Sequence, residues 1–396
     1  MSETLNLGNG NWATKEDSLL AYNSENGNFK PLPFDFTRDT VATVVNKAGL
    51  IETVGSGEPR IDFSNDAKGA LLLEPTRLQL LPYSEDFTNA AWVKTNVTLT
   101  SSNVISPDGT QNASKIEATA SDSSLQDSIT VTSGTTYTLS VYLKTVSGTL
   151  DTAIGLGSPG FPQNEGEGGR YKNITVTNEW KRYTLTSTAD ASAATGIGVG
   201  GFNSFSTGEE VYVWGAQLEQ GSYATSYIPN FGNSAGATRS ADVCSNGGNE
   251  QVFNDRNASG VLYTEMSALA NEGGVRAVSL NDGSTSNRIS IRYNSTSNQI
   301  QYQYTVGGSV QASITYNVND VTLNHKIAVK WAFNDFQLFI DGVLRGTDVS
   351  GNVMSSGTLK TLDINGSSVY DYMYSKIKDV QVLSYQTDAQ MIALTS

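Results

Sequence analysis

Apolar and polar residues alternate at every second position in short runs along this 396-residue chain. The clearest run is 137–144, in which Tyr137, Leu139, Val141 and Leu143 fall on one side of an extended backbone and Thr, Ser, Tyr and Lys on the other. A period of two is typical of a β-strand that buries one face. Because Gly, Asn and Ser separate the runs, the pattern predicts short antiparallel strands joined by turns.

The composition agrees with an all-β protein. Hydrophobic residues make up 38% of the chain and charged residues 16%, which is enough for a core when each strand buries only one face. The length exceeds that of one ordinary domain, so we expect two or three. The formal net charge is −14 and no segment is basic, so we expect no nucleic-acid binding. We also expect no membrane insertion, because no apolar run reaches membrane-spanning length.

Cysteine content and the N-terminus bear on where such a chain is made. Cys244 is the single cysteine, so an intrachain disulfide is excluded. Residues 1–8 lack the basic and apolar segments of a secretory leader. This combination fits a protein that assembles inside a host cell and is released by lysis. A cytoplasmic protein of another role is the alternative.

The pattern divides the chain into four segments. Residues 1–83 show short strands between Gly and Asn turns, and residues 84–229 form a β-sandwich. Residues 230–250 are rich in Gly, Asn, Ser and Ala, which favours a linker. Residues 251–396 form a second all-β unit.

Within 251–396 the local signals are specific. Residues 288–293, 299–304 and 378–383 alternate as strands, with Ile300, Tyr302 and Tyr304 on one face. Asp341-Gly342 lies between two apolar runs and predicts a type I′ hairpin. Residues 387–390 have the spacing of a capping box, which predicts a short final helix.

Three resemblances arise from these motifs. The order of 83–92, 137–144, 179–186 and 211–229 resembles the carbohydrate-binding-module-like β-sandwich of bacteriophage head spikes and tail fibres. Residues 1–83 resemble the N-terminal region of phage head spike and head fibre proteins, and 325–394 resembles concanavalin-A-like, laminin-G-type lectin domains. The resemblance implies an N-terminal β-rich attachment region followed by two antiparallel jelly-roll β-sandwiches.

The same resemblance implies a function. The resemblance implies a fibre or spike subunit of a virion that binds host surface polysaccharide reversibly. Such a subunit is assembled in the host cytoplasm and is extracellular after lysis. The resemblance also implies a homotrimer whose N-terminal region contacts other capsid or tail proteins. A decoration protein that binds nothing is the alternative, and a polysaccharide-cleaving enzyme is the third hypothesis.

Two glycine-rich loops, 155–171 and 200–208, carry the candidate glycan-binding residues. Aromatic rings, amides and carboxylates on a glycine frame suit a sugar, although a loop that binds nothing would have the same sequence. The candidates are Phe161, Glu165, Arg170, Tyr171, Phe202, Asn203 and Phe205.

The sequence favours no enzymatic activity and no cofactor. His325 is the only histidine, so a zinc site built on several histidines is excluded. A glycosidase needs two carboxylates, and Glu165 and Glu167 could supply them, but a solvated loop explains both. One group of Asn and Asp side chains could bind a structural calcium ion. The alternative is that these residues only form an Asn-Asp-Gly turn. That group consists of Asn281, Asp282 and Asn287.

Several arginines and tryptophans could be read as binding residues. Arg38, Arg60 and Arg77 could gather around an anion, but we expect them to form ion pairs. The expected partners are Asp39, Asp62 and Glu74. Trp92, Trp180 and Trp214 could be sugar platforms. Because large aromatic residues within strands usually pack in a core, we expect Trp180 and Trp214 to be buried.

Overall fold

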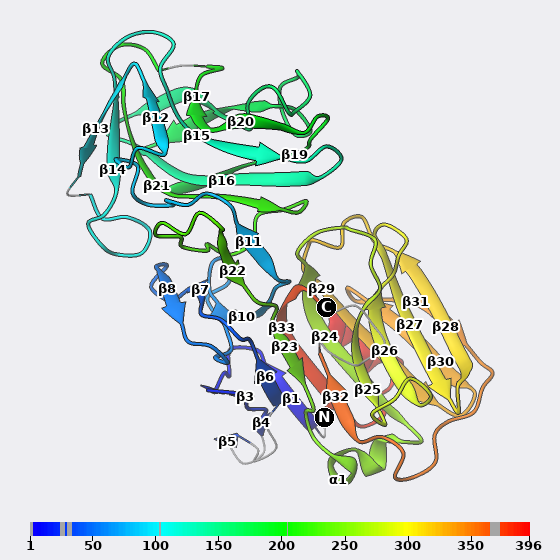
Figure 1. The fold of residues 1–396 in the computed structure, drawn as a ribbon. Coiled ribbons are helices and arrows are strands. Elements are labelled where there is room, and N and C mark those ends of the chain that lie inside the picture. Colours follow the sequence, from blue (N-terminus) through cyan, green and yellow to red (C-terminus); the bar gives the residue numbers. More distant parts are fainter. Residues whose placement is uncertain (1–2, 24–27, 30–33, 103, 204, 365–372) are drawn as a thin grey trace. The chain divides into compact units, whose positions relative to one another are not determined.

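The computed structural model describes residues 3–23, 28–29, 34–102, 104–203, 205–364 and 373–396 (Figure 1). The chain forms two compact units. The first contains Met1–Gly49, Thr53–Pro75 and Ser240–Ser396, and the second contains Leu50–Glu52 and Thr76–Arg239. Both consist of antiparallel strands, which confirms the all-β, antiparallel sandwich fold class.

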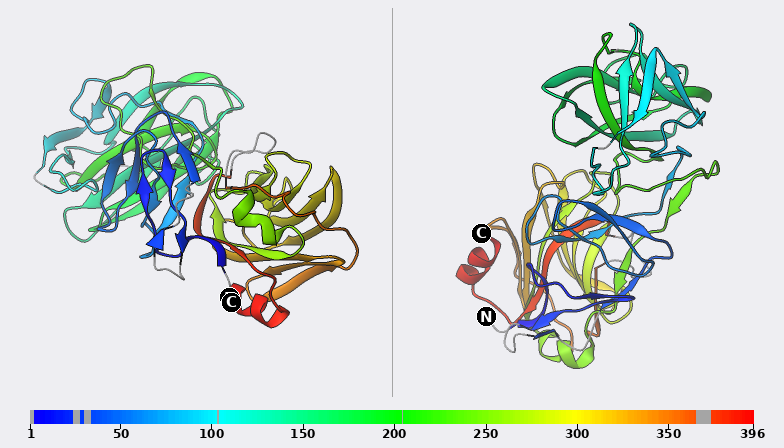
Figure 2. Two further views of the ribbon diagram at one scale, coloured as in Figure 1. Left: turned by 90° about the horizontal axis from the view of Figure 1, so that it is seen from below. Right: turned by 90° about the vertical axis from the view of Figure 1, so that its left-hand side faces the viewer.

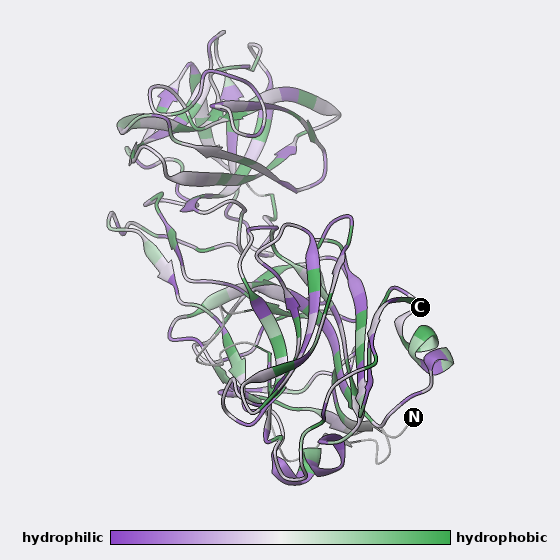
Figure 3. Ribbon diagram, turned by 90° about the vertical axis from the view of Figure 1, so that its right-hand side faces the viewer, coloured by the Kyte–Doolittle hydropathy of each residue, from purple (hydrophilic) through white to green (hydrophobic). Residues whose placement is uncertain are grey.

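Two large sheets form the sandwich of the first unit. One has the order β31 (Val343–Asp348), β30 (Asp335–Ile340), β29 (His325–Ala332), β24 (Gly260–Ala268), β33 (Ser375–Leu383), β1 (Glu3–Gly8), β4 (Tyr22–Asn23) and β5 (Asn28–Phe29). The other has the order β28 (Ser309–Asn317), β27 (Gln299–Val306), β26 (Arg288–Tyr293), β25 (Arg276–Asn281) and β32 (Thr361–Asp363). Leu262, Ile291, Tyr302, Val329 and Trp331 are among the buried residues of their common core. Figure 3 shows the strands banded in green and purple, as a period of two requires.

The N-terminal residues belong to this first unit. Strand β1 lies between β33 and β4, and β10 (Ala70–Leu73) pairs with both β33 and β9 (Ile61–Asp62). Strand β6 (Phe34–Thr37) pairs with β23 (Val243–Ser245) and with β3 (Ser18–Leu19), which also pairs with β2 (Thr14–Lys15). The division therefore differs from the boundaries at 83 and 250 that composition indicates, because strands more than 300 residues apart complete one sheet.

The second unit contains two five-stranded sheets. The first has the order β12 (Trp92–Thr95), β15 (Ser124–Val131), β20 (Ala193–Gly200), β17 (Thr149–Gly155) and β18 (Tyr171–Thr177). The second has the order β13 (Val97–Ser101), β14 (Ser114–Ala118), β21 (Glu210–Gln220), β16 (Thr136–Thr145) and β19 (Lys181–Thr188). Strand β11 (Arg77–Gln79) pairs with β22 (Ala237–Arg239), so part of the expected linker is strand. β7 (Ala42–Val45) and β8 (Ile51–Val54) form a separate ribbon.

The alternation in β16 is confirmed, but that in β21 changes phase. Val211 and Val213 point into the core of the second unit, and further along the strand Ala216 and Leu218 do so. Gly215 lies between them with φ +61°, at a register irregularity between β21 and β16. A bulge of this kind inserts one residue and exchanges the two faces of a strand. A regular period of two from Val211 and Val213 predicts that Ala216 shares a face with Trp214, opposite the valines, and the bulge makes this prediction wrong.

The tryptophans differ in burial. Trp92 and Trp214 are buried, and the ring of Trp214 lies 4.6 Å from that of Tyr227. The expectation for Trp214 is confirmed. Trp180 is only half-buried, so the expectation that it belongs to the core is wrong. It lies in the turn between β18 and β19, where its Nε1 donates to the carbonyl oxygen of Ile105 at 2.8 Å.

The hairpin and the final helix of the first unit are confirmed. Asp341 (φ 49°) and Gly342 (φ 75°) join β30 and β31 with the two positive φ angles of a type I′ turn. Thr387 caps α2 (Asp388–Thr395) in a complete capping box with Gln390. Met391 of α2, red in Figure 2, packs with residues of β24, β29, β30 and β33.

The other helical elements are short. They are α1 (Glu250–Phe253) and the 3₁₀ turn η1 (Asn254–Arg256). Among the described residues, no helix has the length and apolar character needed to cross a membrane.

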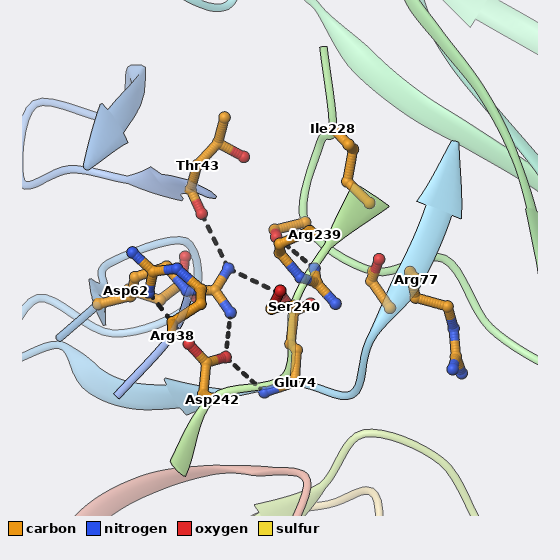
Figure 4. A network of polar contacts seen from close by, with 12 residues as sticks. Arg38, Thr43, Asp62, Glu74, Arg77, Ile228, Arg239, Ser240 and Asp242 are labelled. Carbon is orange, nitrogen blue, oxygen red and sulfur yellow. Dashed lines mark hydrogen bonds and ion pairs between the residues drawn. The ribbon is translucent and has the colours of Figure 1, made fainter. Parts of the chain in front are cut away.

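Two arginines of the first unit enter a buried ionic network (Figure 4). Arg60 forms ion pairs with Glu74 (2.7 Å) and Asp242, and Arg38 contacts the second oxygen of Asp242 at 3.1 Å. The backbone N–H of Glu74 also donates to Asp242 at 2.8 Å. The expected pairing of Arg60 with Glu74 is confirmed, and Asp242 connects it to Arg38.

Asp62 and Arg77 have other ion-pair partners than the sequence indicated. Asp62 forms an ion pair with Lys376 at 2.6 Å. Arg77 lies in the second unit and pairs with buried Glu219 at 3.5 Å, while its guanidinium lies 5.2 Å from the ring of Tyr223. The three acids named from the sequence therefore do not account for Arg77, because its partner is distant in the chain.

Candidate glycan-binding site

One face of the β12–β15–β20–β17–β18 sheet has an unusual row of residues. Gln126 of β15 is paired with Gly198 of β20, Gly198 with Gly155 of β17, and Gly155 with Tyr171 of β18. Directly paired residues point to the same side of a sheet. Their neighbours Leu125 and Ile154 are in the core, so this row lies on the opposite, outer face. Gln126 and Tyr171 are thus separated by two residues without side chains.

An aromatic stack stands on this face. The ring of Phe202 lies 4.7 Å from that of Tyr171, and the two planes differ by 11°. The guanidinium carbon of Arg170 lies 4.8 Å from the Phe202 centroid. A Cβ at Gly155 would come within 2.9 Å of Phe202 Cε2, so the ring rests directly on the glycine. Only glycine permits this approach, and the stack therefore has a fixed position on the sheet.

Polar groups surround the stack. Glu165 is exposed and accepts a hydrogen bond at 2.6 Å from Asn173, which lies on the same face of β18 as Tyr171. Within the described residues, the Tyr171 hydroxyl and the Gln126 amide have no hydrogen-bond partner in the protein. The backbone carbonyl of Asn203 accepts from Thr152 at 2.9 Å, which holds the loop that carries Phe202. The face thus combines an aromatic platform with amide, carboxylate, hydroxyl and guanidinium groups.

Two of the expected binding residues are corrected by the structure. Phe161 and Phe205 are at most 1% exposed and belong to the core of the second unit. The ring of Phe161 meets that of Tyr137 edge-on at 6.0 Å. Both side chains stabilise glycine-rich loops from inside and are not accessible to a ligand. Loop sequence alone does not distinguish an aromatic anchor from an exposed platform.

Glu167 has a structural role beside this site. Its Oε1 contacts Lys172 Nζ at 2.6 Å, and its Oε2 accepts from the backbone N–H of Thr186 at 2.9 Å. The two oxygens therefore hold the loop against β18 and β19. Glu165 and Glu167 do not form a pair of carboxylates directed at one point.

No protein-family model matches the chain, and no curated protein matches it. Solved structures with similarity include the CBM40 of the Ruminococcus gnavus IT-sialidase bound to α2,3-sialyllactose, with 14% identity and a TM-score of 0.31, covering 36% of this chain and 84% of that one. Domain 4 of AbnA, a GH43 arabinanase from Geobacillus stearothermophilus in complex with arabinotriose, has 8% identity and a TM-score of 0.31, covering 39% and 73%. Bacillus licheniformis β-glucanase has 18% identity and a TM-score of 0.28, covering 37% and 72%. Similarity at this level assigns no ligand to this chain.

The group considered for calcium forms a turn in the first unit. Asn281 Oδ1 accepts from the N–H of Gly283 at 2.8 Å, and Asn287 Oδ1 accepts from the N–H of Gly307 at 2.8 Å. Asp282 accepts from Ser284 and from Asn287 Nδ2. Burial by itself would raise the pKa of Asp282, but these hydrogen bonds hold it below its ordinary value. These side-chain oxygens accept hydrogen bonds within the turn, as the Asn-Asp-Gly alternative predicts.

Residues that could bind a metal or act in catalysis also have structural roles. No cluster of three or more His, Cys, Asp and Glu is found in the part of the chain that the structure describes. His325 Nδ1 contacts Asp341 at 2.7 Å and its Nε2 contacts the carbonyl of Asp320 at 3.0 Å. Residues 232–236 have the spacing of a nucleophile elbow, but they form a turn that leads into strand β22.

Sequence reasoning missed part of the site. Gln126 and Asn173 lie within strands, whereas the residues expected to bind a glycan come from loops. A signal was present in the glycines of β20, because Gly196, Gly198 and Gly200 follow one another on one face. Glycine on alternate positions of a strand indicates that another group approaches that face closely.

Proposed function

We propose that this protein is a carbohydrate-binding protein of a virion, a fibre or spike subunit that attaches reversibly to host surface polysaccharide. The observation that carries the binding proposal is the Tyr171–Phe202 stack on Gly155, flanked by Glu165 and Asn173. The virion role is supported by the resemblance of residues 1–83 to phage head spike and fibre proteins.

The chemistry of the face suits a sugar. The C–H groups of a pyranose ring pack on an aromatic face, and its hydroxyls need both donors and acceptors. Because each ring of the stack is ordered by the other and by Arg170, little side-chain entropy remains to be lost when a ligand binds. The acceptor on Glu165 and the donor on Asn173 are already oriented by their mutual hydrogen bond. This preorganisation favours binding without chemical change, and we propose no cleavage.

A shallow face of this kind binds one sugar unit weakly. Copies that act together raise the avidity by roughly a hundredfold or more without any new contact. A homotrimer, which the phage resemblance implies, would supply three such faces. Light scattering of the purified 42.3 kDa chain measures whether it forms this assembly.

The binding test uses the full-length chain on an array of purified bacterial surface polysaccharides. Tyr171→Ala removes the platform, and Gly155→Ala displaces Phe202 while every polar group stays. We expect each variant to bind the best polysaccharide about tenfold more weakly or worse. Phe231→Ala is the matched control, because Phe231 is an aromatic residue of the same unit that is 75% exposed and outside the stack.

The outcomes separate the three hypotheses. Binding that survives Tyr171→Ala and Gly155→Ala would exclude this face as the site. No binding of the native oligomer to any polysaccharide, or to host cells before and after periodate oxidation, would favour a decoration protein. Release of reducing ends from a bound polysaccharide would identify an enzyme. Immunogold labelling of particles released at lysis tests the virion location independently.

A further inference from the structure

Exposed polar side chains continue the candidate glycan-binding site along strand β18. Asn173 and Thr175 follow Tyr171 at every second position, and the residues between them point into the core, so all three lie on the outer face of the sheet. Strand β17 has only glycine and alanine opposite the first two of these rows, and it has Asp151 opposite Thr175. From Tyr171 to Thr175 this polar track measures about 13 Å at the usual rise of a strand. The track is therefore longer than a single sugar unit.

Two carboxylates lie on the polar track. Glu165 Oε1 accepts from Asn173 Nδ2 at 2.6 Å, and Asp151 Oδ1 accepts from Thr175 Oγ1 at 2.6 Å. Both acids are exposed, and neither forms an ion pair with any residue that the structure describes. Each carboxylate therefore keeps its negative charge and its second oxygen for a group outside the protein.

The cations next to Tyr171 in the chain are directed to the protein. Lys172 Nζ contacts Glu167 at 2.6 Å, so its charge is neutralised. Arg170 donates to the side-chain oxygen of Gln163, and its guanidinium carbon lies 4.8 Å from the centroid of Phe202. Two exposed carboxylates against this one guanidinium leave the polar track with an excess of negative charge.

The charge of the polar track discriminates between classes of sugar. An ammonium group on an amino sugar would form charge-assisted hydrogen bonds with the carboxylates, and a neutral hydroxyl would form weaker ones. A carboxylate on a uronic acid would be repelled, because like charges across a binding face oppose association. The track therefore favours basic sugars over neutral ones and neutral sugars over acidic ones.

We propose that this site selects glycans that carry free amino groups over glycans that carry carboxylates, with Glu165 and Asp151 as the specificity-determining residues. The inference rests on the proposed function, because it names the class of glycan for the same site. Binding depends on the aromatic stack, whereas selection by charge depends on the two acids. The two proposals can therefore fail separately.

The test uses the full-length chain and purified bacterial surface polysaccharides in chemically matched forms. N-deacetylation converts acetamido groups to free amines, and carboxyl reduction converts uronic acids to neutral sugars. We expect the unsubstituted protein to bind each deacetylated or reduced form about fivefold more tightly than its untreated counterpart. Both differences should shrink when the salt concentration rises from about 0.05 M to about 0.5 M, because exposed charges are screened.

Charge-removing variants assign the preference to the two acids. Glu165→Gln and Asp151→Asn keep an acceptor oxygen for Asn173 and Thr175 but remove the negative charges. The variant with both substitutions should bind the matched forms of each polysaccharide within about twofold of each other. Glu117→Gln is the matched control and should keep the preference, because Glu117 is an exposed carboxylate on the other sheet of the same unit.

The outcomes distinguish the selection from the site. Equal binding of the matched forms by the unsubstituted protein would overturn the proposal and leave the aromatic stack standing as a glycan site. A preference that persists in the double variant would do the same. Tyr171→Ala should weaken the binding of every form, and binding that survives this substitution would exclude the face as the site, and this inference with it. Absence of binding to every form would contradict the proposed function itself.

Discussion

Arg60 shows how a single residue determines the stability of the first unit. Its side chain is fully buried and contacts Glu74 Oε2, Asp242 and the carbonyl of Thr43. Burial alone lowers the pKa of Arg60, but Asp242 and Glu74 outweigh burial and raise it above its ordinary value. The guanidinium is therefore charged in the folded state, where it forms an ion pair with each of the two carboxylates.

Arg60→Ala should lower the free energy of unfolding by about 3–5 kcal/mol, because it removes the buried positive charge that Glu74 and Asp242 both contact. Urea unfolding followed by tryptophan fluorescence measures this loss. Lys172→Ala is the matched control, because its ion pair with Glu167 is exposed and should contribute about 0–1 kcal/mol. Equal losses in the two variants would contradict the proposed importance of the buried network.

Asp108 gives a pH dependence at the residue scale. Burial by itself would raise the pKa of Asp108, but hydrogen bonds from Ser106, Thr110 and Asn112 hold it below its ordinary value. A carboxyl with a lowered pKa stabilises the fold above its unfolded pKa and loses this contribution as the pH falls through its folded pKa. The native protein should therefore be more stable than Asp108→Asn at about pH 6, and this advantage should shrink towards about pH 3. A stability difference that is equal at both pH values would refute this role of the charge.

Single residues also show where sequence reasoning reaches its limit. The pairing of Arg60 with Glu74 was predictable because both lie near each other in the chain and no other role was indicated. Asp242 was not predictable, because 182 residues separate it from Arg60. Tyr171 and Arg170 were correctly expected at an exposed site. Phe161 and Phe205 were expected there too, but both are buried. Residue type gives the chemistry of a side chain, whereas its direction depends on the packing of the loop.

At the scale of elements, strand β21 shows how one glycine controls a whole face. A regular period of two from Val211 and Val213 would turn Ala216 away from the core. It did not predict the bulge, because a bulge is defined by the partner strand, here β16, as much as by the glycine itself. The consequence is that Ala216 and Leu218 point inward and Trp214 packs against Tyr227.

Gly215→Ala tests this account. At φ +61° an L-residue is strained, and the added Cβ would lie 3.2 Å from Tyr142 and 3.4 Å from Tyr227. Gly134→Ala is the matched control, because Gly134 has φ +79° with nothing within 4 Å. We expect Gly134→Ala to lower the free energy of unfolding by about 1 kcal/mol and Gly215→Ala to lower it by about 1–3 kcal/mol. Urea unfolding of both variants measures the difference. A smaller loss for Gly215→Ala than for Gly134→Ala would show that the close aromatic contacts are unimportant.

At the scale of the whole molecule, the first unit is assembled from both ends of the sequence. β33 pairs with β24, its neighbour within the C-terminal segment, and with β1 and β10 from the N-terminal segment. Leu5, Leu7, Phe34 and Leu71 are buried in the same core as residues of 251–396. Local signals identified the strands of 251–396 correctly, but they contain no information about pairing over such a distance. Local pattern and composition therefore distributed this unit over three segments, an attachment region, a linker and a lectin-like domain.

This arrangement predicts how fragments of the chain behave. A fragment of residues 76–239 retains its own core and both five-stranded sheets, and it should unfold cooperatively with the fluorescence of buried Trp92 and Trp214. A fragment of residues 251–396 loses β1, β10 and the buried residues of β6. Its central strand β33 would expose one edge and apolar side chains, so it should aggregate or lack a cooperative transition.

Adding residues 1–75 as a separate chain supplies the missing strands, with Ser240–Gln251 kept on the C-terminal fragment so that β23 can pair with β6. We expect this mixture to form a soluble complex that unfolds in one transition, measured by circular dichroism. Replacing Leu5 and Leu71 with Asp in the added chain is the control, because both are buried and the change should prevent assembly. A cooperative transition of 251–396 alone would show that the C-terminal sandwich is independent and that the N-terminal strands only decorate it.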